Sequence, residues 1–74
     1  MTDRLVAEIA AAERRIRPSV LETPLLPSPA LTDEVGAEIL LKYENRQRTG
    51  SFKLRGATNC LLSLPEAVRR RGVV

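Results

Sequence analysis

The order of elements over residues 37–74 constrains the fold of this chain more than any other feature. Residues 37–43, Ala-Glu-Ile-Leu-Leu-Lys-Tyr, show the period of two that is typical of a strand. A polar loop over 44–50, a helix over 51–64, a short helix over 65–71 and the start of another strand at Val73 follow. This is the order of a βαβ unit, whose strands lie parallel in a sheet covered on both faces. We therefore expect an α/β fold with an incomplete parallel sheet.

The first half of the chain predicts two helices joined by an extended arm. Apolar residues recur with a helical period over 3–16, and Pro18 ends that helix. Residues 18–30 contain four prolines, which predict a connecting arm and not a regular element. A short helix is expected over 29–35, between a Ser cap and a Gly stop.

These elements predict a single partial domain over residues 1–74. It consists of an N-terminal helix (1–17), a proline-rich arm with a short helix (18–36), and a strand-loop-helix segment (37–74). A core of this size is marginal without a disulfide, a metal or a partner.

Composition removes several classes of site. The sequence has no histidine and one cysteine, Cys60. An internal disulfide is therefore impossible, and a structural zinc site, which needs about four Cys or His ligands, is excluded. No run reaches the roughly 18–20 apolar residues of a membrane span, and the acids near the N-terminus do not fit a targeting peptide. We expect a cytoplasmic protein without a membrane partner.

The net charge of +3 comes mainly from arginines. They gather at positions 14, 15 and 17, at 46 and 48, and at 69–71. Such clusters fit either a polyanion such as nucleic acid or a solvated surface. The sequence has one Phe, one Tyr and no Trp, so few rings are available to stack on bases. We favour the solvated surface and do not expect a nucleic-acid partner.

Lys53 is the residue with the most distinctive chemistry. It lies at the start of the helix expected over 51–64 and opens the apolar stripe of that helix. One interpretation is a lysine whose stem packs on the helix while its ammonium group reaches water. The other is a nucleophile, because a neutral amine attacks carbonyls, and burial and the positive end of a helix dipole both favour the neutral form.

The residues before Lys53 extend the second interpretation. Gly50 and Ser51 precede the helix, with Ser51 in the position of an N-cap, and the free N–H groups of a helix start can hold an anion. This arrangement suits a lysine that forms a Schiff base with a phosphate-bearing aldehyde. A P-loop is excluded, because no Gly-Lys-Ser/Thr run is present.

Residues 41–57 resemble the lysine segment of threonine dehydratases and serine racemases, which are fold type II, or tryptophan-synthase-β-like, enzymes. The stretch reads Leu-Lys-Tyr-Glu-Asn-Arg-Gln-Arg-Thr-Gly-Ser-Phe-Lys-Leu-Arg-Gly-Ala. The family also has an N-terminal amphipathic helix and a Thr-Pro-Leu arm, matched here by Thr23-Pro24-Leu25. The resemblance covers residues 5–74. It implies the N-terminal part of a fold type II domain, with pyridoxal 5'-phosphate (PLP) as the cofactor.

The resemblance also implies roles for three residues. Lys53 matches the lysine that holds PLP as an internal aldimine and later acts as the base at Cα. Ser51 and Phe52 match the residues that position this lysine and pack near the cofactor; by pattern alone they are an N-cap and an apolar filler. The implied reaction is a β-elimination, in which threonine or serine gives a 2-oxo acid and ammonia. Serine racemases and hydroxyectoine-degrading enzymes share the motif, so the amino acid substrate stays open.

The sequence departs from this family after residue 74. The family's loop for the substrate carboxylate, its glycine-rich phosphate loop and its residue at the pyridine nitrogen have no counterpart here. We expect a truncated dehydratase, an ammonia-lyase that is inactive alone, because catalysis needs positioned groups. One alternative is a piece of a split enzyme that docks on a C-terminal complementing chain. Another is a small basic module that binds RNA or an acidic protein.

Overall fold

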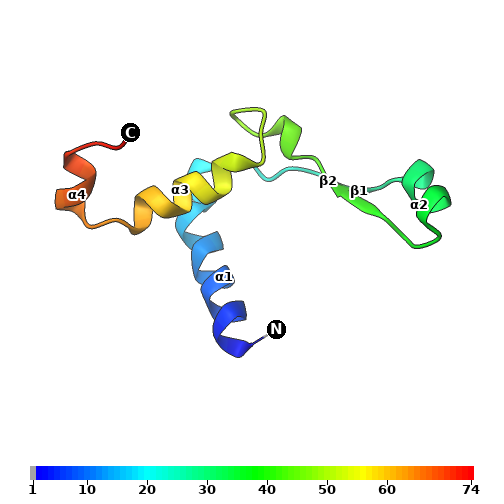
Figure 1. Ribbon diagram of the computed structural model, residues 1–74, viewed down its shortest axis with the longest axis horizontal. Coiled ribbons are helices and arrows are strands. Elements are labelled where there is room, and N and C mark those ends of the chain that lie inside the picture. Colours follow the sequence, from blue (N-terminus) through cyan, green and yellow to red (C-terminus); the bar gives the residue numbers. More distant parts are fainter. Residues whose placement is uncertain (1) are drawn as a thin grey trace. The chain divides into compact units, whose positions relative to one another are not determined.

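A computed structural model describes residues 2–74 of the chain (Figure 1). They form two compact units. One contains the residues up to Val20 together with Lys53–Val74, and the other is Leu21–Phe52. Within residues 2–74, no helix is long and apolar enough to cross a membrane.

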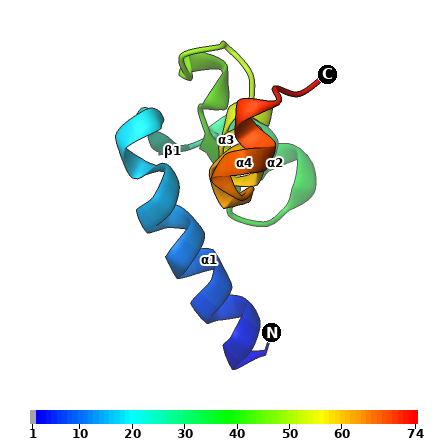
Figure 2. The ribbon, with the colours of Figure 1, turned by 90° about the vertical axis from the view of Figure 1, so that its left-hand side faces the viewer.

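The first unit is helical. It contains α1 (Asp3–Ile16), the 3-10 turn η1 (Arg17–Ser19), α3 (Lys53–Ser63) and α4 (Glu66–Arg70). The helix predicted over 3–16 is confirmed, and Figure 2 shows α1 running into the turn at η1. Thr2 caps α1, because its hydroxyl accepts a hydrogen bond from the N–H of Leu5 at 3.2 Å.

Polar contacts join α1 and α3 in this unit. The Arg15 guanidinium donates to the Asn59 side-chain oxygen at 2.5 Å, and Glu13 lies 3.8 Å from Arg55. Ile16 and Val20 are each 5% exposed and are the buried apolar residues of the described chain. Such a small apolar core gives this unit little hydrophobic stabilisation of its own.

The second unit is built on a two-stranded antiparallel sheet. Strand β1 (Leu25–Pro27) pairs with β2 (Leu40–Lys42) in a register that sets Leu26 opposite Leu41. Figure 1 shows the two strands side by side, with α2 (Pro29–Val35) in the connection between them. The helix predicted over 29–35 is confirmed, with Ser28 as its cap and Gly36 after its end.

The structure corrects the prediction that residues 18–30 contain no regular element. Three of them form β1, and hydrogen bonds extend the pairing on both sides of it: Ser28 N–H to the Ile39 carbonyl, and Tyr43 N–H to the Pro24 carbonyl. In a two-stranded sheet each strand has an outer edge, so a residue without an N–H, such as Pro27, is tolerated. The proline content is therefore compatible with an edge strand, which the sequence analysis did not predict.

Several predicted element bounds were too wide. The strand expected over 37–43 is restricted to β2 (Leu40–Lys42), and the helix expected over 51–64 is α3 (Lys53–Ser63). The helix expected over 65–71 is α4 (Glu66–Arg70), so Pro65 precedes its first residue. Val73 and Val74 belong to no strand. The sheet present among residues 2–74 is antiparallel, so the expected parallel pairing is not seen in this part of the chain.

Gly36 provides a test of the α2 end. Its φ of 78° lies in the left-handed region, and no atom lies within 4 Å of the position that a Cβ would take there, so only the backbone conformation resists a side chain. We expect Gly36→Ala to lower the free energy of unfolding by about 1–2 kcal/mol. Gly56 is the matched control, because it lies inside α3 with equally open space and without a positive φ; Gly56→Ala should stabilise by about 0.5–1 kcal/mol. Urea titrations followed by circular dichroism measure both, and equal effects would contradict the explanation.

Candidate functional site

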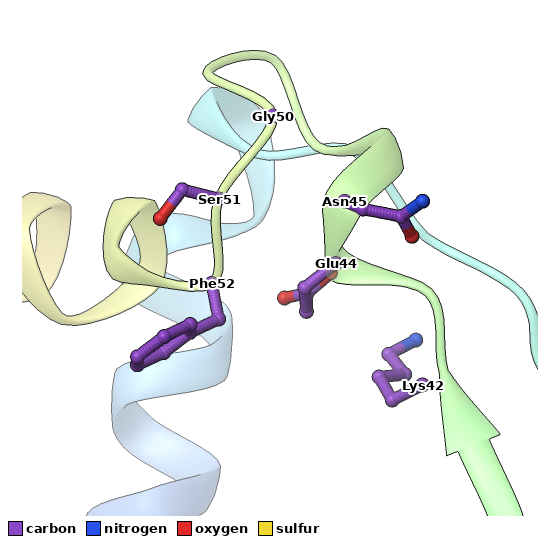
Figure 3. Close-up of a pocket in the computed structure, with 6 residues that line it drawn as sticks. All are labelled: Lys42, Glu44, Asn45, Gly50, Ser51 and Phe52. Carbon is purple, nitrogen blue, oxygen red and sulfur yellow. The ribbon is translucent and has the colours of Figure 1, made fainter.

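A surface depression of about 440 Å³ lies on the second unit. Its walls come from the end of β2, the 3-10 turn η2 (Glu44–Arg46) and the segment that leads to α3. Figure 3 shows the six residues that line it: Lys42, Glu44, Asn45, Gly50, Ser51 and Phe52. We call it the loop depression. Its volume is in the range of small-molecule sites, and its lining combines a carboxylate, an ammonium, an amide and an aromatic ring.

Buried Thr23 joins the arm to the loop depression. Thr23 is 5% exposed, and its hydroxyl donates to a carboxylate oxygen of Glu44 at 2.6 Å. The ammonium of Lys42 donates to the Thr23 backbone carbonyl at 2.5 Å. One arm residue thus fixes two charged side chains of the depression through bonds to ionised groups, which are stronger than neutral ones.

Gln47 makes a second set of bonds between the arm and the loop. Its side-chain oxygen accepts from the Leu21 N–H at 2.7 Å, and its side-chain nitrogen donates to the Leu21 carbonyl at 3.0 Å. The same nitrogen lies 3.4 Å from Glu44 Oε2, and the same oxygen accepts from the Arg48 N–H at 3.2 Å. We call these bonds the Gln47 network. Gln47 is 4% exposed, so the side-chain amide is buried with both of its polar atoms bonded.

A tight turn follows Gln47 and leads to the reactive segment. The Gly50 N–H donates to the Gln47 carbonyl at 2.7 Å, which closes a four-residue turn. Gly50 has a φ of 71°, a left-handed conformation that a residue without Cβ adopts at no steric cost. The conformation of residues 47–50 therefore sets where Ser51 and Phe52 emerge on the wall of the depression.

The predicted site residues fall on both sides of a unit boundary. Ser51 is half-buried and Phe52 is 73% exposed, and both line the loop depression. Lys53 is the first residue of α3, follows Phe52 directly and is exposed. The interpretation of Lys53 as a nucleophile relied partly on burial of its side chain. In the described chain Lys53 is exposed, and α3 contains no buried residue.

Three buried or half-buried polar residues of this region were missed as site residues: Thr23, Glu44 and Gln47. All three entered the sequence analysis only as parts of the family resemblance. A signal was present for Gln47, because it is an amide in a loop rich in arginines. Nothing in the local pattern, however, indicates that its partner is Leu21, 26 positions earlier.

Thr23→Val tests the bond to Glu44. Valine has nearly the same shape but removes the donor, which leaves a partly buried carboxylate oxygen with one bond fewer. We expect a loss of about 1.5–3 kcal/mol in the free energy of unfolding, the range for hydrogen bonds to charged groups. Thr32→Val is not a neutral comparison, because the Thr32 hydroxyl accepts from the Ile39 N–H. Thr49→Val, at an exposed loop position, is the control and should change stability little.

The arginine clusters contain several side chains with partners inside the chain. Arg17 pairs with Glu13 and Arg70 with Glu66, each four residues apart on the sequence. Arg46 lies over the Tyr43 ring, 5.0 Å from its centre. These contacts agree with a solvated surface and supply no observation in favour of nucleic-acid binding.

The chain is similar to enzymes that use pyridoxal phosphate. The family described as pyridoxal-phosphate dependent enzyme matches residues 16–74. An L-threonine ammonia-lyase of Thermotoga maritima is 48% identical over 67 residues, which is 90% of this chain and 17% of that protein. The catabolic L-threonine dehydratase of Escherichia coli is 44% identical over 69 residues, which is 93% of this chain and 21% of that protein. A serine racemase of Schizosaccharomyces pombe is 42% identical over 78 residues, which is 100% of this chain and 24% of that protein. The chain thus spans about a fifth of the length of these relatives.

Proposed function

Because the chain belongs to the pyridoxal-phosphate dependent enzyme family, we propose that it supplies the lysine segment of a PLP-dependent ammonia-lyase that acts on a 3-hydroxy amino acid such as threonine or serine. Lys53 is the catalytic residue in this proposal, and Ser51 and Phe52 bind beside it. We propose that the whole enzyme has a fold type II domain and that residues 1–74 are its N-terminal part. Further residues would complete the parallel sheet. Residues 1–74 are then one part of a single domain.

The place of Lys53 in the chain supports its assignment as the lysine that carries the cofactor. The sequence contains two lysines, Lys42 and Lys53. The ammonium of Lys42 is held by the Thr23 carbonyl, next to the sheet that the same segment forms. Lys53 instead begins a helix, directly after the two residues that line the loop depression. A lysine must present its amine to an aldehyde carbon to form a covalent bond. Both lysines are exposed, so the assignment to Lys53 rests on its match to the motif lysine and on its place directly after Ser51 and Phe52.

The donor set beside Lys53 fits PLP. The exposed ring of Phe52 offers an apolar face to a pyridine ring, and the hydroxyl of Ser51 offers a hydrogen bond. When bound, PLP supplies the electron sink that stabilises negative charge at the substrate Cα. In this proposal Lys53 would hold the cofactor, and its amine would take the proton from the substrate Cα. The Cβ hydroxyl would leave together with a proton as water, so that the elimination removes one proton from Cα and the hydroxyl from Cβ. The resulting enamine would react with water to give a 2-oxo acid and ammonia.

The 74 residues alone do not provide an enclosed site. Lys53 and Phe52 are exposed, and the loop depression is open to solvent. Catalytic groups act strongly only where water is excluded and the donors are positioned in advance. We therefore propose that the isolated chain is inactive and that the remaining groups come from the rest of a family enzyme.

The sheet of the second unit favours such a partner polypeptide. All six residues of β1 and β2 are exposed, and five of them are Leu or Pro. Paired residues share a face, so Leu26 and Leu41 lie on one face and Pro27 and Leu40 on the other. A sheet with apolar residues on both faces is stable when both are covered. We propose that the other four fifths of a family enzyme cover them, as a continuing or a separate chain.

A chimera tests the proposed function. The segment of the Thermotoga maritima enzyme that aligns with this chain would be replaced by residues 1–74, and ammonia release would be measured with threonine, serine and 3-hydroxyaspartate. The proposal expects ammonia and 2-oxo acid from at least one of them. A folded chimera that takes up PLP but releases ammonia from none of the three would contradict the ammonia-lyase assignment.

A further inference from the structure

The Gln47 network uses both polar atoms of the buried side-chain amide, and its bonds reach the arm and the loop before Lys53. The two-way pair between the Gln47 side-chain amide and the Leu21 backbone has the pattern of a strand pairing, made by a side chain. The backbone carbonyl of Gln47 closes the turn to Gly50, and its backbone N–H donates to the Glu44 carbonyl at 3.1 Å. Both the backbone and the side chain of one residue therefore fix residues 44–50.

We infer that Gln47 is a positioning residue for the lysine segment: through its bonds to Leu21, it fixes the turn from which Ser51 and Phe52 emerge and after which Lys53 follows. The inference deepens the proposed function and rests on it, because positioning matters only if Lys53 reacts. Gln47 itself does not line the loop depression and is not assigned a contact with the cofactor.

The chemistry of this position favours an amide over the other side chains. The Gln47 nitrogen donates toward two acceptors, the Leu21 carbonyl and Glu44, while its oxygen accepts from two backbone N–H groups. A glutamate would keep the acceptors but lose the donor, and would set a second carboxylate beside Glu44. An alanine would leave the Leu21 N–H and carbonyl without these partners.

Hydrogen exchange of the 74-residue chain tests the structural half of this inference. In the parent, the amides of Leu21, Arg48 and Gly50 should exchange slowly. In Gln47→Ala, all three should exchange about tenfold faster or more, because the bonds to the Leu21 and Arg48 amides are lost and the turn that holds the Gly50 amide is no longer anchored. The control is Arg48→Ala, whose exposed side chain has no part in the network, and it should match the parent. Absence of protection at Leu21 in the parent, or equal loss in Arg48→Ala, would overturn the inference.

The positioning role itself is tested in the chimera by the rate at which PLP becomes covalently attached to Lys53. Aliquots would be reduced with borohydride and the adduct quantified by peptide mass. Gln47→Ala should lower the maximal rate at saturating PLP about tenfold, in protein whose circular dichroism shows it folded. A merely structural role would lower the folded fraction and leave the rate per folded molecule unchanged, which would refute positioning.

The two experiments separate the possible failures. If the exchange result holds but no variant, parent included, forms an adduct at Lys53, the proposed function is wrong and the positioning inference falls with it, while the Gln47 network stands. If the parent forms the adduct and Gln47→Ala forms it equally fast, the proposed function stands and the positioning inference is wrong.

Discussion

Replacing Lys53 by alanine should reduce ammonia release by the chimera by about 10²–10⁴-fold, the usual contribution of a positioned proton-transfer group. The reason is chemical: alanine has no amine to hold the cofactor or to take the Cα proton. Lys53→Arg should fail to a similar extent, since a guanidinium keeps the charge but stays protonated and does not replace an amine in either role. Initial rates at saturating threonine measure both variants.

Arg14→Ala is the control for these variants, because Arg14 is exposed on α1 and takes no part in the proposed site. It should retain the parent rate. Substantial activity in both Lys53→Ala and Lys53→Arg would mean that another group holds the cofactor, and Lys42 would be the first residue to examine. Addition of a primary amine such as methylamine offers a further check, because it can replace part of the missing proton transfer in Lys53→Ala but not restore a lost fold.

The second large effect is expected between the isolated chain and the chimera. The 74-residue chain should release no ammonia above the rate given by free PLP in buffer, whereas the chimera should be active. The difference arises because the chain leaves Lys53, Phe52 and the loop depression open to water, while enclosure strengthens every electrostatic contact in a site. An equal mixture of the chain with the remaining part of the Thermotoga maritima enzyme, added as a separate polypeptide, should show partial recovery.

The outcomes of the mixing experiment separate the two forms of the partner proposal. Recovery that depends on the concentration of the second polypeptide favours docking of a separate chain. Activity of the isolated chain at the level of the chimera would contradict the argument from exposure. Leu26→Asp, which places a charge on one apolar face of the sheet, should abolish recovery by mixing, while Thr49→Val should not.

Much of the local structure could be predicted from the sequence, because its causes are local. The helix at Asp3–Ile16 follows from apolar periodicity and a cap, and the helix at Pro29–Val35 from a Ser cap, a proline at its first position and a glycine stop. The start of α3 was placed two residues early, because Ser51 has the composition of a cap while the helix begins at Lys53.

The missed features depend on contacts between distant parts of the chain. Strand β1 exists because residues 25–27 pair with 40–42, and three-residue strands in a proline-rich segment carry little signal of their own. The burial of Gln47 likewise depends on Leu21, and that of Thr23 on Glu44. Local patterns do not reveal these pairs, although the family resemblance did select the segment in which they occur.

The candidate site likewise combines residues that a local motif identifies with residues that only contacts between distant parts of the chain reveal. Lys53, Ser51 and Phe52 were singled out from a motif, whereas the residues that hold the neighbouring loop were found from the hydrogen bonds. Spacing alone left Lys53 open to interpretation as an ordinary surface lysine, and its exposure in the described chain agrees with that local pattern. The choice in favour of chemistry rests on the family and on the place of Lys53 directly after two residues of the loop depression.

Locating the covalent adduct shows whether Lys53 is the residue that holds the cofactor. The chimera would be incubated with PLP, reduced with borohydride, digested and mapped by mass spectrometry, with Lys53→Ala treated in parallel. We expect one dominant modified peptide from residues 1–74, with the added mass on Lys53, and its absence in the variant. Modification centred on Lys42, or modification spread equally over surface lysines in both proteins, would contradict the assignment of Lys53.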